Sequence, residues 1–319
     1  MLIKVKKGQN IDKYQIALDT INKDVILPYD MYIEQDDSTI AVKAGTLIDD
    51  KIYDVLQSQK AVFIPKKYVD LRKNESKNLE TYISYAKHNP EYCINYLYKM
   101  NDIFFDNFLK SSDNLFDFED VESMIKAIIL LIRHNRNFVK ENIIHFQNDN
   151  MLAHHSLHVA IYAVNLGISL EIQDKKLLSL GMAGYLQDIG IKKVDNNIVL
   201  KDSKLSADEI EDIHKHAMYS TEIIKHNHIH NPHIIEAIMH HHENYDGSGY
   251  PNHLKKGEIS IFASILSICD VFDALTSTRP YRKEMSSFEA LTYMMKDEQM
   301  RNRFNHQYIK IFITLLVKK

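Results

Sequence analysis

The chain has 319 residues, of which 45% are hydrophobic and 26% charged, and its formal net charge is −4. This composition is typical of a globular protein with a substantial core, and the slight acidity excludes a bulk attraction to nucleic-acid polymers or acidic membranes. Two cysteines are too few for a disulfide framework, and no apolar run approaches the roughly 20 residues that span a bilayer, so we expect a cytoplasmic protein.

The first part of the chain predicts a small module of mixed structure. Short patterns favour strands at Val25–Ile33, Ile40–Lys43 and Ala61–Pro65, with a helix at Ile48–Leu56. The polar stretch Arg72–Lys77 is typical of a linker. We therefore expect an α+β module over residues 1–70, a helical extension over 71–149 and a main domain over 150–319. The module is a candidate for sensing a ligand, docking a protein partner or forming a homodimer, and its residues do not decide among these.

The rest of the chain indicates a mainly helical fold. From Leu79 onward glycine and proline are rare, and apolar residues recur every three or four positions. The segment Phe118–Phe146 predicts one long helix or two.

Two later helices carry clear start signals. Ser206 and Glu209 form a capping box ahead of a helix expected over Ile210–His226. Asn231 followed by Pro232 is typical of an N-cap and a first helical position.

Histidine is unusually frequent, with 17 copies, and residues 240–251 read HHHENYDGSGYP. Neutral imidazole is the commonest protein ligand for divalent transition metals. If the helix that begins at Pro232 continues this far, roughly 100° per residue places His241 and His242 beside its apolar stripe and turns His240 to solvent. Two adjacent inward histidines need a partner, because burying them unpaired is costly.

A second candidate element is the strongly apolar helix expected over Ile259–Leu275. Asp270 and Asp273 are three residues apart and share its buried face. A buried carboxylate must be paired, capped or bound to a metal. For Asp270 we favour a metal, whereas a salt bridge to an arginine explains Asp273 equally well.

Two further candidate segments lie upstream. His155 lies on the apolar stripe of its helix, with His158 at the edge as a candidate core histidine, and His154 is expected to face solvent. Asp188 is an inward acid at the end of another helix, just before a glycine stop at Gly190.

His216 lies on the side of Ile213 in the capped helix and completes the set of candidate ligands. These come from separate helices and are His155, Asp188, His216, His241, His242 and Asp270. Mixed imidazole and carboxylate ligands suit iron, manganese, zinc or nickel rather than calcium. Six ligands exceed what one tetrahedral ion needs, so Asp188 is a candidate bridge between two ions.

The motifs resemble the HD-GYP family, a branch of the HD hydrolase superfamily with an all-helical bundle. The resemblance covers about Asn150 to the C-terminus, and its signature residues are, in order, HHE at 241–243, DG at 246–247, GYP at 249–251, DVFDALTS at 270–277 and RPYR at 279–282.

The resemblance implies hydrolysis of cyclic di-GMP at a centre of two divalent metals, most often iron or manganese. It makes the six candidate ligands metal ligands, with Asp188 and Asp270 at the catalytic core. Arg279 is then expected to bind a substrate phosphate, with Tyr250 and Arg282 on the substrate side. A guanidinium suits bidentate phosphate binding.

Three departures from the family bear on this activity. Gln187 replaces the histidine of the His-Asp pair, and its amide is a weaker, neutral donor. Ile191 stands where the family has a lysine, leaving the neighbouring Lys192 as the candidate substrate contact. Met151 replaces the glutamate of three-metal members, so we expect two metals. The alternatives are a degenerate domain that binds cyclic di-GMP as a receptor or protein-interaction module, and a purely structural helical domain.

Overall fold

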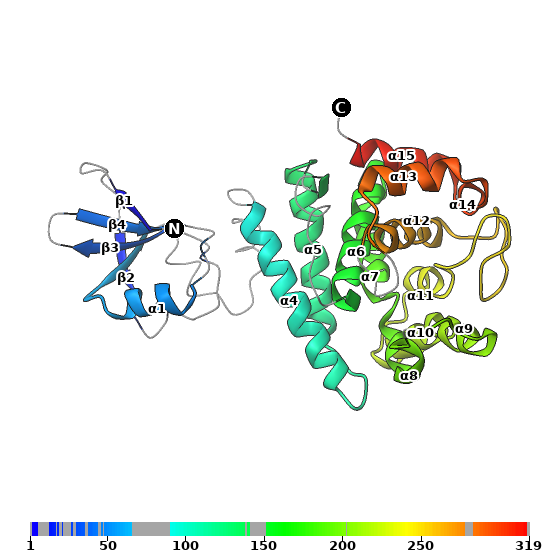
Figure 1. Ribbon diagram of the computed structural model, residues 1–319, viewed down its shortest axis with the longest axis horizontal. Helices are drawn as coiled ribbons and strands as arrows, with labels where there is room; N and C mark the ends of the chain where they lie inside the picture. Colours follow the sequence, from blue (N-terminus) through cyan, green and yellow to red (C-terminus); the bar gives the residue numbers. More distant parts are fainter. Residues whose placement is uncertain are drawn as a thin grey trace. The chain divides into compact units, whose positions relative to one another are not determined.

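The computed structural model describes residues 2–5, 13–16, 18, 21, 27, 30–35, 38–43, 46, 48–65, 90–137, 139–140, 151–201, 203–277 and 283–317. The chain divides into two compact units, Met1–Leu97 and Tyr98–Lys319. The boundary falls inside the long helix α4, Pro90–Lys110 (Figure 1).

The first unit is built on an antiparallel sheet in the order β1-β4-β3-β5-β2. Its elements are β1 (Leu2–Val5), β2 (Lys13–Ile16), β3 (Met31–Gln35), β4 (Ser38–Val42), α1 (Asp50–Gln57) and β5 (Val62–Pro65). Central β3 pairs with both neighbours, with Tyr32 opposite Ala41 on β4 and Ile33 opposite Val62 on β5. The side chains of Ile33, Val62 and Leu56 of α1 are buried and form the core of this unit.

Four of the predicted elements of this unit match β3, β4, α1 and β5. The strand expected over Val25–Ile33 corresponds to β3, Met31–Gln35. Leu27 is not in a strand, and residues 22–26, 28 and 29 lie outside the described part. The sequence did not indicate β1 or β2. In β2 only Ile16 is buried, so the strand lacks a clear apolar alternation.

In the described part of the second unit every named element is a helix. After α4 its elements are α5 (Phe118–His134), α6 (Met151–Ser169), α7 (Asp174–Leu186), the 3₁₀ helix η4 (Ile189–Lys193), α8 (Asn196–Val199), α9 (Ala207–His214), α10 (His216–His226), α11 (Pro232–Met239), α12 (Ile261–Thr276), α13 (Ser287–Lys296), α14 (Glu298–Asn302) and α15 (His306–Leu316). The predicted mainly helical fold with a small N-terminal α+β module is confirmed. The segment expected as one long helix or two begins with α5, and residues 141–150 lie outside the described part.

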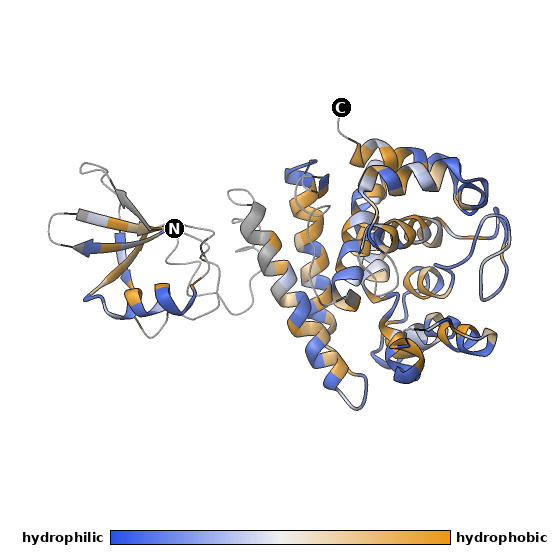
Figure 2. Cartoon of the chain, viewed as in Figure 1, coloured by the Kyte–Doolittle hydropathy of each residue, from blue (hydrophilic) through white to orange (hydrophobic). Residues whose placement is uncertain are grey.

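Helix α6 is the centre of this unit. It packs against α5, α7, α12 and α15. The rings of Tyr162 on α6, Phe272 on α12 and Phe312 on α15 meet edge to face, with centroids 5.2 to 6.0 Å apart. In Figure 2 apolar residues run along these helices, whereas the long connection from α11 to α12 is mostly polar. The central helices therefore form a rigid support for polar side chains at their edge.

Two helix ends, those of α9 and α11, differ from the sequence prediction. At each of them a histidine Nδ1 atom forms a hydrogen bond with a backbone carbonyl. The capping box at Ser206 and Glu209 is present, but the helix breaks at Lys215 into α9 and α10. The Nδ1 atom of His216 lies 2.7 Å from the carbonyl oxygen of Ile213, a group that would otherwise continue the helical ladder. Asn231 and Pro232 begin α11 as predicted.

Helix α11 ends at Met239, before the histidine run, so the helical phase used to place these residues stops there. His241 repeats the bond of His216, with Nδ1 2.7 Å from the carbonyl oxygen of Ile238. His240 is partly buried rather than solvent-facing, and its Nδ1 atom is buried without a hydrogen-bond partner.

The turn around Asp188 is set by contact with α10. Helix α7 ends at Leu186, and the carbonyl of Gln187 accepts a bond from the Ser220 hydroxyl at 2.6 Å. The same hydroxyl accepts the amide N–H of Gly190 at 2.8 Å. A Cβ atom at Gly190 would lie 2.2 Å from the carbonyl oxygen of His216. The predicted glycine stop is therefore a close approach of two backbones rather than a left-handed turn.

No helix in the described ranges is both long enough and apolar enough to cross a membrane.

We predict that Gly190→Ala lowers the free energy of unfolding by about 1–3 kcal/mol or more, the cost of overpacking a dense interior. Urea denaturation with metal ions removed measures it. Gly257→Ala is the matched control, because a Cβ there meets nothing within 4 Å, and it should change stability by no more than about 0.5 kcal/mol. Equal stabilities of the two variants would contradict the close approach.

Candidate metal centre

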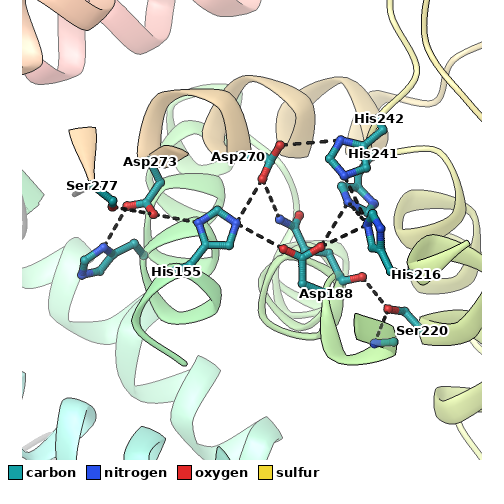
Figure 3. A network of polar contacts seen from close by, with 12 residues as sticks. His155, Asp188, His216, Ser220, His241, His242, Asp270, Asp273 and Ser277 are labelled. Carbon is teal, nitrogen blue, oxygen red and sulfur yellow. Dashed lines mark hydrogen bonds and ion pairs between the residues drawn. The ribbon is translucent and has the colours of Figure 1, made fainter. Parts of the chain in front are cut away.

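The six candidate ligands converge in two overlapping groups. One group holds Asp188, His216, His241 and His242, and the other holds His155, Asp188 and Asp270, with the ligand atoms of each group within 4.8 Å of one another. Figure 3 shows Asp188 between them, with His155 and Asp270 on one side and the histidines on the other. Five elements supply these side chains: α6, the α7–η4 turn, α10, the segment after α11, and α12.

The three histidines of the first group bring their Nε2 atoms together. His216 and His241 each point Nδ1 at a backbone carbonyl, which can only accept, so Nδ1 carries a proton and the neutral ring that binds a metal has its lone pair on Nε2. Those Nε2 atoms are 3.4 Å apart, and the Nε2 of His242 is 3.2 Å from that of His216. In the neutral rings the facing lone pairs of His216 and His241 repel, and a bound cation is a partner that satisfies both. This donor set fits a divalent transition metal.

Asp188 faces both groups. Its Oδ1 lies 3.3 Å from the Nε2 of His216 and 3.5 Å from that of His241, and its Oδ2 lies 3.3 Å from the Nε2 of His155. Burial alone would raise the pKa of Asp188, but the neighbouring His155, His216 and His241 hold it well below the usual range. The carboxylate is therefore ionised, as a bridging ligand must be.

The side chain of Gln187, a doubtful ligand from the sequence, lies beside the second group. Its side chain is fully buried, and its Nε2 donates to Asp270 Oδ1 at 3.3 Å. Its Oε1 is buried without a hydrogen-bond partner. A buried amide oxygen without a donor is costly, and coordination to a cation would satisfy it. The second group therefore offers one imidazole, two carboxylates and an amide, and is richer in oxygen than the first.

Among the described residues Asp273 is paired with two histidines, rather than with the arginine that the sequence offered as one explanation. Its Oδ2 lies 2.7 Å from Nδ1 of His155 and its Oδ1 lies 2.8 Å from Nδ1 of His158. Burial would raise the pKa of Asp273, but His158 and His155 hold it well below the usual range. Ser277 donates a further bond to Oδ2 at 3.2 Å. His158 is thus a satisfied core histidine, one of the alternatives given by the sequence.

His154 also differs from its prediction, because it is buried rather than solvent-facing. Its Nε2 lies 3.1 Å from Asp102 on α4, which covers this face of α6. The phase of α6 could not reveal a second helix packed on that side.

The turn after the histidines is tied down by an acid that sequence reasoning passed over. Glu243 is buried, and its carboxylate accepts the amide N–H groups of Asn252 at 2.6 Å and Leu254 at 2.9 Å. Its place directly after the histidine run was the available signal. The two bonds close the turn that presents Tyr250.

Tyr250 lies beside the first ligand group. Its ring stacks on His214, with centroids 3.6 Å apart and planes 12° from parallel, and on His242 at 4.8 Å. Burial, with Asp270 and Asp188 nearby, raises the pKa of Tyr250, so its hydroxyl keeps its proton and can donate. His214 was not singled out from the sequence, because stacking partners leave no periodic signal.

Lys192 does not lie with the ligand groups, which corrects its expected place on the substrate side. Its ammonium donates to the carbonyls of Phe108 and Ser111, both at 2.5 Å, and sits 4.5 Å from the centre of the Phe108 ring. A cation at the carbonyl end of α4 is favourable, and this position holds Lys192 there. Arg279 and Arg282 lie outside the described residues.

The HD-domain family model matches residues 138–305, more than half of the chain, so this chain belongs to the HD-domain family. It is 31% identical over 159 residues to a cyclic di-GMP phosphodiesterase of Pseudomonas aeruginosa, covering 50% of this chain and 38% of the relative. It is 38% identical over 142 residues to a 3′3′-cGAMP-specific phosphodiesterase of Vibrio cholerae, covering 44% of this chain and 31% of the relative.

A solved HDG"Y"P protein of Bdellovibrio bacteriovorus shares the fold, with a TM-score of 0.60 and 17% identity over 96% of this chain and 99% of that one. The resemblance to HD-GYP domains indicated by the motifs is confirmed. The chain spans about a third of the length of the two curated relatives.

We predict that divalent manganese or iron stabilises the protein against heat. At a free concentration 100 times the dissociation constant, one site contributes about 2.7 kcal/mol, measured as a rise in melting temperature. His241→Ala should lose most of this rise, because its Nε2 faces the other ligands. His230→Ala, at an exposed position outside both groups, should keep it. A wild-type protein indifferent to these ions would contradict the metal centre.

Proposed function

We propose that the chain is a metal-dependent phosphodiesterase that hydrolyses cyclic di-GMP or a related cyclic dinucleotide. The observation that carries this proposal is the pair of ligand groups that share Asp188. The names of the relatives supply the substrate class. The domain limits at 70 and 149, a cytoplasmic location, and a homodimer or protein partners through residues 1–70 stay proposals from the sequence.

In this proposal each ligand group holds one divalent ion. His216, His241 and His242 with Asp188 would hold one ion, while His155, Asp270 and Asp188, assisted by the Gln187 amide oxygen, would hold the other. Iron or manganese suits the mixed set, and zinc or nickel suits the imidazole-rich group. When bound, such a pair supplies an activated water and neutralises charge on the phosphate.

The residues around the ions have distinct roles. Asp188 and Asp270 are ionised acceptors that face the Nε2 of His155 at 3.3 and 3.0 Å, so they can orient the attacking water by accepting its hydrogen bonds. Tyr250 offers a protonated hydroxyl on the side of the turn and can donate to a phosphate oxygen. Arg279 and Arg282 are proposed to bind the phosphates from the motif alone. Lys192 is not proposed for this role, because its ammonium is bound at the end of α4.

A cyclic dinucleotide receptor without turnover is the second candidate function. It is favoured by Gln187, which leaves the second group with one imidazole, and by Lys192, whose ammonium is engaged at α4. Each missing interaction needs to cost only about 1.4 kcal/mol to slow the reaction tenfold. The purely structural alternative does not explain why the Nε2 atoms of three imidazoles converge on the Asp188 carboxylate.

We expect the purified chain to convert cyclic di-GMP to linear product when manganese or, under anaerobic conditions, ferrous iron is added. Chromatography of the nucleotides measures the product, and the same reaction with 3′3′-cGAMP compares the substrates. Asp188→Asn should abolish turnover, because both ligand groups use this carboxylate. Binding without product selects the receptor, and neither binding nor product overturns the proposal.

We predict that Gln187→His increases kcat about tenfold, a gain of about 1.4 kcal/mol in transition-state stabilisation, because an imidazole completes the second group. Gln173→His is the control, since it makes the same change at the exposed N-cap of the same helix. Equal rates for Gln187→His and wild type would show that the amide already serves as a full ligand.

A further inference from the structure

A chain of buried hydrogen bonds connects α4 to the ligand His155. The hydroxyl of Tyr98 lies 2.5 Å from the Nε2 of His158, whose Nδ1 is 2.8 Å from Asp273 Oδ1. The other oxygen of Asp273 is 2.7 Å from the Nδ1 of His155. All four side chains are buried. Figure 3 shows the last link, with Asp273 on the far side of His155 from Asp188.

The direction of each bond follows from the chemistry of its ends. An ionised carboxylate only accepts, so His155 and His158 both donate from Nδ1 to Asp273. With the Nδ1 proton of His158 directed at Asp273, its Nε2 is the acceptor for the hydroxyl of Tyr98. With its Nδ1 directed at Asp273, His155 turns Nε2 toward Asp188 and Asp270, where the neutral ring can bind a metal. A metal-binding histidine is commonly fixed in this way by a carboxylate behind it.

Asp273 can hold His155 in place only if it is itself held. It lies three residues after Asp270 on α12, so its orientation fixes His155 relative to that predicted ligand. One oxygen serves His155 and Ser277, and the other serves His158. His158 is therefore the support that keeps the second oxygen from turning, and Tyr98 fixes the ring of His158 in turn.

We propose that Tyr98 and His158 are positioning residues for the metal ligand His155 and act on it through Asp273. The inference rests on the proposed metal centre. Neither residue lies in the ligand groups, to which the described side chains of α4 contribute nothing. Helix α4 is thus part of the support of the second ligand group, and the link begins at the residue where the chain enters its second unit.

A second buried tyrosine provides a matched control. The hydroxyl of Tyr185 on α7 donates to Asn101 on α4 at 2.9 Å, and its ring is fully buried. Like the bond of Tyr98, this bond joins α4 to the helices behind it. It does not lead to His155. Tyr98→Phe and Tyr185→Phe therefore each remove a buried hydroxyl bond between α4 and another helix, and only the first bond leads to the ligand.

The experiment is an anaerobic titration of the metal-stripped full chain with cobalt(II), followed by visible absorption. The binding step that disappears in His155→Ala identifies the second ligand group. Tyr98→Phe should weaken that step about tenfold, within the usual range for residues that support a metal ligand. The step that depends on His242 should be unchanged. Tyr185→Phe should leave both steps within about twofold of wild type, with a comparable loss of melting temperature.

A double variant tests the route. In an Asp273→Asn background, adding Tyr98→Phe should weaken the His155-dependent step no further, because its effect passes through Asp273. His158→Asn keeps an amide nitrogen that can donate toward Asp273, but its shorter side chain does not extend to the Tyr98 hydroxyl. It should therefore reproduce the effect of Tyr98→Phe even if that variant folds poorly. Wild type without cobalt binding would sink the proposed function itself. Wild-type binding with equal affinities for Tyr98→Phe and Tyr185→Phe would overturn only this inference.

Discussion

The site depends on one repeated interaction, the bond between a histidine Nδ1 and the backbone carbonyl three residues earlier. At His216 this bond accompanies the break between α9 and α10, and at His241 it follows the end of α11. In both places it fixes the proton on Nδ1 and turns the lone pair of Nε2 inward. In neutral rings two lone pairs 3.4 Å apart are unfavourable without a cation. The backbone bonds at these two histidines therefore orient both rings for metal binding.

Asp188 joins this arrangement to the rest of the domain. Its turn exists because Ser220 of α10 takes the carbonyl of Gln187 and the amide of Gly190. The same helix therefore provides His216 and shapes the segment that carries the shared carboxylate. A shift of α10 against η4 would move both at once, which is why the absence of a Cβ at Gly190 matters to function as well as to packing.

The two ligand groups are chemically unequal. The first combines three imidazoles with Asp188, whereas the second combines His155 with two carboxylates and the Gln187 amide. Softer imidazole ligands suit iron, zinc or nickel, and oxygen ligands suit manganese. In a centre of this kind the two sites need not bind their ions with equal affinity. The side chains that hold His155 in place matter because His155 is the one imidazole of the second group.

The sequence by itself determined the mainly helical class, the family and the six ligand candidates, because residue type and motif spacing are local properties of the chain. Helical phase also placed His155 and Asp270 on buried faces. Tertiary structure decided the contacts that helical phase cannot predict. It buried His154 under α4, ended α11 before His240, paired Asp273 with two histidines and held Lys192 at the end of α4. Each of these outcomes depends on a partner from a distant segment, and a periodic pattern records only which face is apolar, not which side chain will meet it.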